Sequence, residues 1–181
     1  MTENEIEDAV WQNVTELGYD SACAVRNVRI GPEQGQADLA LFPRNGKKKI
    51  ILVEAKRSAA EDAKSKVVGQ IIMYLTGALQ LSHEGIRLYR NYARLHPDKA
   101  RGKARTSPKQ IAGTASAREA WELLHKGTPV KPDEIAIYIA TDGPPGTQLK
   151  VAVDLLSEQY QLHIGLIQAS KRGIQVIKKC P

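Results

Sequence analysis

The stretch that most constrains the fold runs from Gln36 to Lys56 and reads QADLALFPRNGKKKIILVEAK. Two apolar runs flank Pro43-Arg44-Asn45-Gly46, which is the pattern of a β-hairpin. Ionisable side chains nevertheless stand in these runs, with Asp38 in the first and Glu54 and Lys56 at the end of the second. Burying such groups costs on the order of several kcal/mol unless they are paired or bind a metal. The hairpin therefore predicts a site where two carboxylates and a lysine meet.

The length of the hairpin loop decides which side chains share a face of the sheet, because side chains alternate along each strand. We expect a three-residue loop, 44–46, with Gly46 in the left-handed conformation and Pro43 opposite Lys47. A two-residue loop of Asn45 and Gly46 would instead put the two carboxylates on opposite faces, unless a bulge corrected the register.

With the three-residue loop, Asp38 lies opposite Leu52, and Glu54 lies opposite Gln36. Asp38, Glu54 and Lys56 then share one face, with Glu54 diagonal to Asp38 and within reach of a common ion. A shared metal ion therefore requires an odd-length loop or a bulge.

The composition is that of a globular protein, with 181 residues of which 42% are hydrophobic and 25% are charged. This length suits one domain over residues 1–181. Two cysteines, Cys23 and Cys180, are too few for a four-cysteine zinc or iron–sulfur site, and the four histidines lack zinc-like spacing. No segment is long and apolar enough to span a membrane, and the acidic start does not resemble a signal peptide. We therefore expect a cytoplasmic protein without a membrane partner.

Positive charge is concentrated in one segment, residues 87–109. The net charge of the chain is +6, and this segment holds eight basic residues against one acidic residue, Asp98. A localised basic block suits a polyanion better than an evenly basic surface does, so we expect it to contact DNA. The simpler alternative is a solvated loop. The basic residues are Arg87, Arg90, Arg94, Lys99, Arg101, Lys103, Arg105 and Lys109.

The hydrophobic pattern predicts an α/β fold with a central mixed sheet and helices on both faces. The first half has the order helix, strand, hairpin, helix, with the elements around the hairpin at residues 2–17, 22–30 and 58–81. A basic insertion follows at about 85–132 and includes a helix at 115–126. The second half has the order strand, helix, strand, strand, at residues 134–141, 147–159, 163–168 and 173–178.

Capping boxes mark both early helices, Thr2-x-x-Glu5 in the first and Ser58-x-x-Glu61 in the second, and Gly18 ends the first. The run Lys47-Lys48-Lys49 is most simply a solvated turn. The expected buried face of the first helix comprises Ile6, Val10, Val14 and Leu17. That of the second helix comprises Val67, Val68, Ile71, Ile72, Leu75 and Leu79.

Three short motifs together resemble the restriction-endonuclease-like, or PD-(D/E)XK, nuclease superfamily. Asp38 followed by Glu54-Ala55-Lys56 resembles its D…(D/E)xK signature, and the element order fits its αβββαβ core. Gln70-Ile-Ile-Met-Tyr74 resembles the QxxxY motif of RecB-type nucleases and type I restriction subunits. Glu7, with Leu17-Gly18-Tyr19 behind it, resembles the opening helix of Mrr-like domains. The resemblance covers about residues 3–82 and extends to the rest only by strand order.

The sequence departs from these families in several respects. Ala37 stands where many members have proline. No helicase motor follows, as it does in type I restriction subunits, and the cysteines that hold an iron–sulfur cluster in some RecB-type relatives are absent. The basic insertion is not part of the common core.

The resemblance implies hydrolysis of DNA phosphodiester bonds with Mg²⁺ or Mn²⁺. Asp38, Glu54 and the Ala55 carbonyl would be metal ligands, and Glu7 would complete the shell or bind a second ion. Lys56 would position or activate water and neutralise developing charge. Gln70 and Tyr74 would orient Lys56 or a substrate phosphate.

Each of these residues could instead have a purely structural role. Lys56 and a carboxylate can form a purely structural ion pair, and Glu7 can be a solvated helix glutamate. Gln70 can be a surface residue, and Tyr74 a half-buried core aromatic. The chain as a whole can be a nucleic-acid-binding module of a larger complex that cleaves poorly, or a resolvase acting as a homodimer.

Overall fold

The computed structural model describes residues 1–19, 22–29, 35–43, 46–58, 63–79, 109–110 and 130–181. The helical elements in these ranges are α1 (Glu3–Gln12), the 3₁₀ turn η1 (Val14–Leu17), α2 (Ala63–Leu79), the 3₁₀ turn η2 (Pro132–Glu134) and α6 (Thr147–Gln159). The strands are β1 (Ala22–Arg29), β2 (Gln36–Pro43), β3 (Ile50–Lys56), β4 (Lys109–Gln110), β5 (Ile135–Thr141), β6 (Ile164–Ser170) and β7 (Gly173–Lys178).

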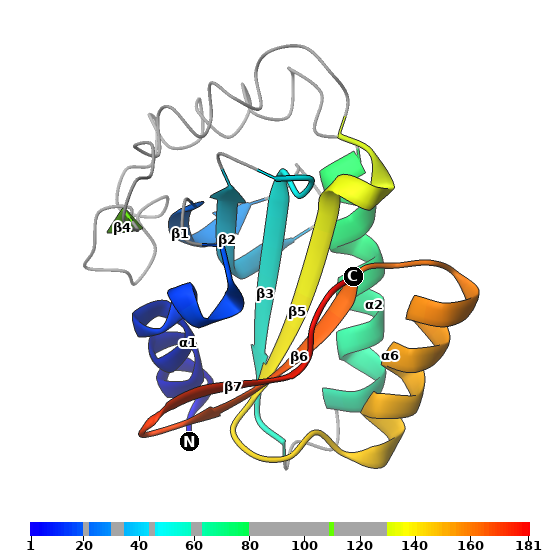
Figure 1. Ribbon diagram of the computed structural model, residues 1–181. Coiled ribbons are helices and arrows are strands. Elements are labelled where there is room, and N and C mark those ends of the chain that lie inside the picture. Colours follow the sequence, from blue (N-terminus) through cyan, green and yellow to red (C-terminus); the bar gives the residue numbers. More distant parts are fainter. Residues whose placement is uncertain (20–21, 30–34, 44–45, 59–62, 80–108, 111–129) are drawn as a thin grey trace.

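The strands form one mixed sheet in the order β4-β1-β2-β3-β5-β6-β7. The pairs β3–β5 and β5–β6 are parallel, and the other neighbours are antiparallel. Helix α1 covers one face of the sheet, and α2 and α6 cover the other (Figure 1). The predicted α/β class with a central mixed sheet between helices is thus confirmed.

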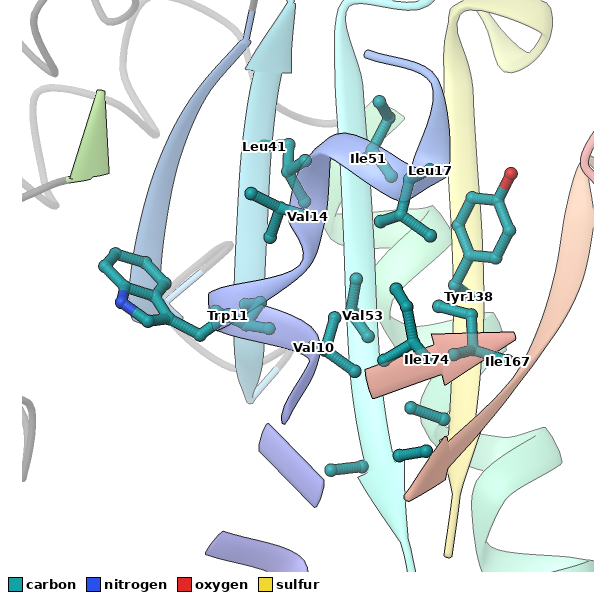
Figure 2. Close-up of a cluster of buried hydrophobic side chains, with 14 of the residues drawn as sticks. Val10, Trp11, Val14, Leu17, Leu41, Ile51, Val53, Tyr138, Ile167 and Ile174 are labelled. Carbon is teal, nitrogen blue, oxygen red and sulfur yellow. The ribbon is translucent and has the colours of Figure 1, made fainter. Parts of the chain in front are cut away.

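Each face of the sheet carries its own apolar cluster. Along β3, Ile50 and Leu52 pack towards α2 and α6, whereas Ile51 and Val53 pack towards α1. Figure 2 shows the cluster under α1, where residues of α1 and η1 meet those of β2, β3, β5 and the β6–β7 pair. A central strand that is buried on both faces needs apolar residues at every position, which accounts for the continuous apolar runs in β3 and β5.

Helix α1 begins as predicted but ends earlier. Its capping box is present, because the Thr2 hydroxyl accepts the Glu5 N–H at 3.2 Å while the Glu5 carboxylate accepts the Thr2 N–H at 2.7 Å. The expected continuous helix over 2–17 is wrong. The side-chain amide of Asn13 donates to the Ala9 carbonyl at 2.8 Å, while its backbone N–H donates to Val10 at 3.1 Å. In a continuing α-helix the backbone N–H of Asn13 would donate to the Ala9 carbonyl, which the side chain occupies here. The backbone N–H donates to the carbonyl three residues back instead, and a 3₁₀ turn follows.

Part of the predicted buried face of α2 lies in solvent. Val67 and Ile71 are buried, and Val68 and Leu75 are partly buried. Ile72, however, is 47% exposed, and Leu79 is also exposed at 36%, so the expectation of burial is wrong for these two. A helix on one face of a sheet buries a stripe of its surface, and the apolar pattern of this helix is wider than that stripe.

The register of β2 with β3 differs by two residues from the expected one. Continued by one residue, the observed register puts Asp38 opposite Glu54, directly rather than diagonally. The expected partners, Leu52 for Asp38 and Gln36 for Glu54, are therefore wrong. Because the register shifts by an even number of residues, Asp38 and Glu54 still lie on the same face of the sheet, as a shared ion requires. Gly46 has the expected positive φ, +92°.

The lysines after the hairpin turn explain this shift. Lys48 is buried, and its ammonium contacts the Asp133 carbonyl at 3.1 Å and the ring of His163. The backbone N–H of Lys49 donates to the Glu134 carbonyl at 2.7 Å. These residues thus pair with the segment before β5, and β3 begins only after them. The expectation of a solvated turn is wrong for Lys48.

Several predictions fall outside the described residues. They are the Ser58-x-x-Glu61 capping box beyond its first residue, the helix at 115–126, and most of the insertion at 85–132. The part of the insertion that is described at 109–110 pairs with β1 at the edge of the sheet. The second half matches well, since α6 has the predicted bounds and β7 is the predicted edge strand. No helix within the described ranges is both long and apolar enough to cross a membrane.

Candidate active site

The candidate site lies at the end of the sheet where β3 and β5 terminate and β2 begins (Figure 1). In the parallel β3–β5 pair, Lys56 at the end of β3 lies opposite Thr141 at the end of β5. The carboxyl ends of neighbouring parallel strands meet at one edge of a sheet, and ligands of α/β proteins bind at such edges.

Asp38 stands just beyond the last backbone pair between β2 and β3. Its Oδ2 atom accepts the backbone N–H of Ala55 at 2.7 Å, which holds the carboxylate against β3. Burial raises the pKa of Asp38 to about 7, and the negative charges of Glu54 and Glu7 add to the rise. The Ala55 N–H and the Lys56 ammonium oppose this rise without cancelling it. Asp38 is therefore a buried carboxyl group whose surroundings, together with two neighbouring carboxylates, favour its protonated form.

Glu54 is the centre of the site and is only 2% exposed. Its Oε1 atom lies 2.6 Å from the Lys56 ammonium, and its Oε2 atom accepts the Tyr74 hydroxyl at 2.7 Å. The same hydroxyl lies 2.8 Å from the carbonyl oxygen of Gln36. A hydroxyl has one hydrogen to donate, so it serves one of these two acceptors at a time. Both oxygens of Glu54 thus have a partner from another position in the chain.

Lys56 carries a positive charge at neutral pH. Burial by itself would lower the pKa of Lys56, but the attraction of Glu54, Glu3 and Asp38 outweighs burial and raises it. The Glu3 carboxylate at the start of α1 lies 3.9 Å from the Lys56 ammonium. The ion pair between Lys56 and Glu54, which the alternative of a structural role for Lys56 requires, is present. A lysine in this state is a source of positive charge rather than a base.

Glu7 is buried at 8% exposure, so the alternative of a solvated helix glutamate is wrong. Its Oε1 atom lies 3.4 Å from the Arg26 guanidinium, which also contacts Asp8 at 2.5 Å and lies 4.9 Å over the Trp11 ring. The negative charge of Glu7 contributes to the raised pKa of Asp38. Glu7 therefore borders the site from the α1 side, already engaged with an arginine.

Gln70 and Tyr74 lie one turn apart on α2, as the sequence predicted. Tyr74 is buried at 2% exposure and reaches the site, whereas Gln70 is only partly buried. The side-chain oxygen Oε1 of Gln70 is buried without a hydrogen-bond partner. A buried acceptor without a donor is unfavourable by about 1–3 kcal/mol, so a donor from water or from a ligand is expected there.

The donor atoms of the site fit a hard divalent cation with a small protein ligand set. In the part of the chain that the structure describes, no three His, Cys, Asp or Glu side chains are grouped closely enough to hold a metal ion. Asp38 and Glu54, with the main-chain carbonyl of Ala55, offer oxygen donors of the kind that Mg²⁺ prefers, and Mg²⁺ usually keeps several waters. The pKa of Asp38 is raised first by burial and then by the negative charge of Glu54, and a bound cation would offset both effects.

Most of the predicted DNA-binding residues lie outside the described residues. These are Arg87, Arg90, Arg94, Lys99, Arg101, Lys103 and Arg105. Lys109 is in β4, where its backbone pairs with Ala24 of β1, and nothing is described of its side chain.

Sequence reasoning missed one polar contact at this edge of the sheet. Asp142, directly after β5, accepts both the backbone N–H and the hydroxyl of Ser58 at 2.7 Å. These bonds tie the chain after Lys56 to the end of the neighbouring strand. The sequence did contain an indication of this contact, because Asp142 directly follows a buried strand. A residue at that position lies beside the end of the neighbouring parallel strand.

The geometry therefore brings Asp38, Glu54, Ala55, Lys56 and Tyr74 together, with Glu7 at their border and Gln70 one helical turn away. Comparison of the chain with protein-family models, with curated proteins and with solved structures gave no match.

Proposed function

We propose that this chain is a divalent-metal-dependent nuclease that hydrolyses DNA phosphodiester bonds. One observation carries the proposal: two carboxylates from neighbouring strands, Asp38 and Glu54, lie next to a lysine cation at the carboxyl edge of the sheet. Burial, together with the negative charge of Glu54, raises the pKa of Asp38 to about 7. Two carboxylates beside one ammonium group leave an excess of negative charge, which a bound metal ion would offset.

A restriction-endonuclease-like core is part of the proposal. The order α1, β1, β2, β3, α2, β5 along the chain agrees with an αβββαβ core, and the motif residues stand at the ends of the strands on which that core would carry them.

Asp38, Glu54 and the Ala55 carbonyl would hold Mg²⁺ or Mn²⁺, which would screen the phosphate charge and lower the pKa of a bound water. The chain itself supplies the remaining chemistry. The Ala55 N–H fixes the Asp38 carboxylate at 2.7 Å, and the Lys56 ammonium offers positive charge where the phosphate becomes more negative in the transition state. One such preorganised donor contributes about 10²–10³-fold in rate.

Helix α2 supports the site from the other side. The Tyr74 hydroxyl, buried and 2.7 Å from Glu54, holds the carboxylate in one orientation. Gln70, with a buried oxygen that lacks a donor, would accept a hydrogen bond from Lys56 or from a water on the phosphate. DNA is favoured as the substrate by the basic residues concentrated at 87–109.

The first test is cleavage of linear, circular, single-stranded and branched DNA with Mg²⁺, Mn²⁺ or EDTA. We expect cleavage that requires the metal, and at least about 10²-fold less of it in Asp38→Asn. Asparagine keeps an acceptor for the Ala55 N–H, so the fold should persist. The matched control is Asp154→Asn on α6, whose carboxylate pairs with Lys178 at 2.5 Å. Equal cleavage activity of the two variants would show that Asp38 takes no part in catalysis.

A second candidate function, a nucleic-acid-binding module without cleavage, is favoured by a different observation. Both oxygens of Glu54 already have partners, Lys56 and Tyr74, and a closed network of this kind is also a stable structural arrangement. DNA binding by the intact protein without metal-dependent cleavage of any of the four substrates would select this function.

A further inference from the structure

The layer formed by α2 and α6 is apolar on the side away from the sheet. The two helices lie next to each other over one face of the sheet (Figure 1). Their outer sides expose four large apolar side chains, which we call the α2–α6 surface: Ile72 and Met73 on α2, 47% and 44% exposed, and Val151 and Leu155 on α6, 61% and 53% exposed. Helix α1, on the opposite face, exposes none of its large apolar side chains.

The apolar side chains of the two helices lean toward each other. On α2, Tyr74 points to Glu54 in β3, so Ile72, about 200° around the helix from Tyr74, lies on the flank toward α6. On α6, Asp154 reaches Lys178 in β7 at 2.5 Å. Leu155 is about 100° further around and lies across the outer side, toward α2. The four side chains therefore form one patch rather than scattered exposed positions.

The patch has the size of a protein interface. Helix α6 has 13 residues and α2 has 17, so they are about 20 Å and 25 Å long. Packed helices lie about 8–10 Å apart, so the outer surface of the pair measures roughly 20 Å by 20 Å. The smaller specific interfaces, with about 600 Å² of accessible surface per partner, are of this scale. Soluble monomers rarely expose a contiguous apolar patch of several hundred Å².

The exposed stripe of α6 is complementary to an antiparallel copy of itself. Val151, Leu155 and Glu158 are four and three residues apart and so share one stripe, with Lys150 at its border. Lys150 and Glu158 are exposed, and neither forms an ion pair within the part of the chain that the structure describes.

A twofold axis near the middle of α6 explains this pattern. It places Val151 of one copy opposite Leu155 of the other, and it brings Lys150 of one copy beside Glu158 of the other. Both contacts then occur twice. A partner with a different sequence would require no such match of the helix with itself, so the opposite charges at the two ends of the stripe favour a second copy.

From this arrangement we infer that the protein forms a twofold-symmetric homodimer through the α2–α6 surface, with α6 antiparallel to α6 of the second copy. Tyr74 contacts Glu54 on the side of α2 that faces the sheet, so the candidate site of each copy lies outside the interface. The dimer is thus independent of what the site does, and its test does not depend on cleavage of DNA.

The test measures the molar mass by sedimentation equilibrium from about 1 to 100 µM, the range that a dimer with micromolar affinity requires. We expect Leu155→Glu to raise the dissociation constant at least about 100-fold, because it puts a charge into the centre of the interface twice. Lys150→Glu alone and Glu158→Lys alone should each raise it about tenfold, since attraction becomes repulsion at two places. The charge swap Lys150→Glu/Glu158→Lys should restore it.

Lys171→Glu is the matched control, with the same change in charge at an exposed position beside α1, on the other face of the sheet. It should leave the dissociation constant unchanged. A protein that stays monomeric at about 100 µM overturns the inference. A dimer that Lys150→Glu weakens no more than Lys171→Glu does, or that the charge swap does not restore, overturns it as well. A monomer whose thermal unfolding temperature falls in Leu155→Glu would show instead that the chain itself covers this surface.

Discussion

The hydroxyl of Tyr74 is the only group from α2 whose contact with Glu54 is described, and it lies at 2.7 Å. The hydrophobic pattern alone does not distinguish this tyrosine from a core aromatic, since it lies on the buried side of the helix, and only the resemblance to a QxxxY motif singled it out. Its ring packs in the core under α2, and only its oxygen reaches the polar site. The ring thus has the core position of the simpler interpretation, although it is buried at 2% exposure rather than half-buried, and the role of the hydroxyl in orienting Lys56 or a phosphate stays a prediction.

Replacing Tyr74 with Phe should lower the free energy of unfolding by about 1.5–3 kcal/mol, the range for a hydrogen bond to a charged group. The ring still fills its place, so the loss isolates the hydroxyl. Urea unfolding monitored by circular dichroism measures the change.

Tyr160→Phe is the control, because Tyr160 is 67% exposed, and a change at such a position stays within about 0.5 kcal/mol. Equal stability of the two variants would mean that the Tyr74 hydroxyl holds nothing in place.

At the scale of elements, the contact between β5, β6 and β7 depends on one glycine. Gly165 in β6 pairs with Tyr138 in β5. A Cβ atom at this position would overlap the Tyr138 ring and would lie 2.7 Å from the backbone carbonyl of Lys178 in β7. The side chain of Tyr138 thus occupies the space that a side chain at 165 would need.

Gly165→Ala should therefore destabilise the fold by about 1–3 kcal/mol or more, the usual range for overpacking, because backbone as well as ring has to move. Gly69→Ala in α2 is the opposite case. It is exposed, with no atom within 4 Å of an added Cβ, so helix propensity predicts a gain of about 1 kcal/mol. Thermal unfolding of both variants checks the pair, and a stabilised Gly165→Ala would show that β5 and β6 are not packed as described.

Element boundaries followed the sequence where local chemistry sets them. The Thr2–Glu5 capping box, α6 at Thr147–Gln159 and the edge strand β7 were all predicted and are present. The exception is the end of α1, which the sequence analysis placed too late. The side chain of Asn13 ends the helix by a hydrogen bond to the Ala9 carbonyl, and the spacing of apolar residues does not predict such a bond.

At the scale of the whole molecule, the raised pKa of Asp38 links stability to pH. The group is protonated below pH 7 in the folded state but only below about pH 4 when unfolded. Between these values the folded state binds the extra proton, so stability falls as pH rises through this window, by at most roughly 1.4 kcal/mol per pH unit. The stabilisation by the proton is complete at low pH and is lost above pH 7.

Two consequences can be measured by urea unfolding in EDTA and in millimolar Mg²⁺. Asp38→Asn should be more stable than the unchanged protein at about pH 8, and the difference should vanish near pH 4. Mg²⁺ should stabilise the unchanged protein more at about pH 8 than at about pH 5, because the ion competes with the proton. Parallel pH curves for the two proteins would show that Asp38 is ionised as in water.

The sequence by itself determined the α/β class, the order of elements, and that Asp38, Glu54 and Lys56 come from neighbouring strands, because the period of apolar residues and short-range turn chemistry are local properties. The tertiary structure alone decided the register of β2 with β3. It differs by two residues from the expected one, because Lys48 is buried against Asp133 and His163 and β3 begins only after it. It alone decided the charge states as well. The pKa values of Asp38 and Lys56 depend on burial and on distances between groups far apart in the chain, and these distances exist only once the sheet has formed.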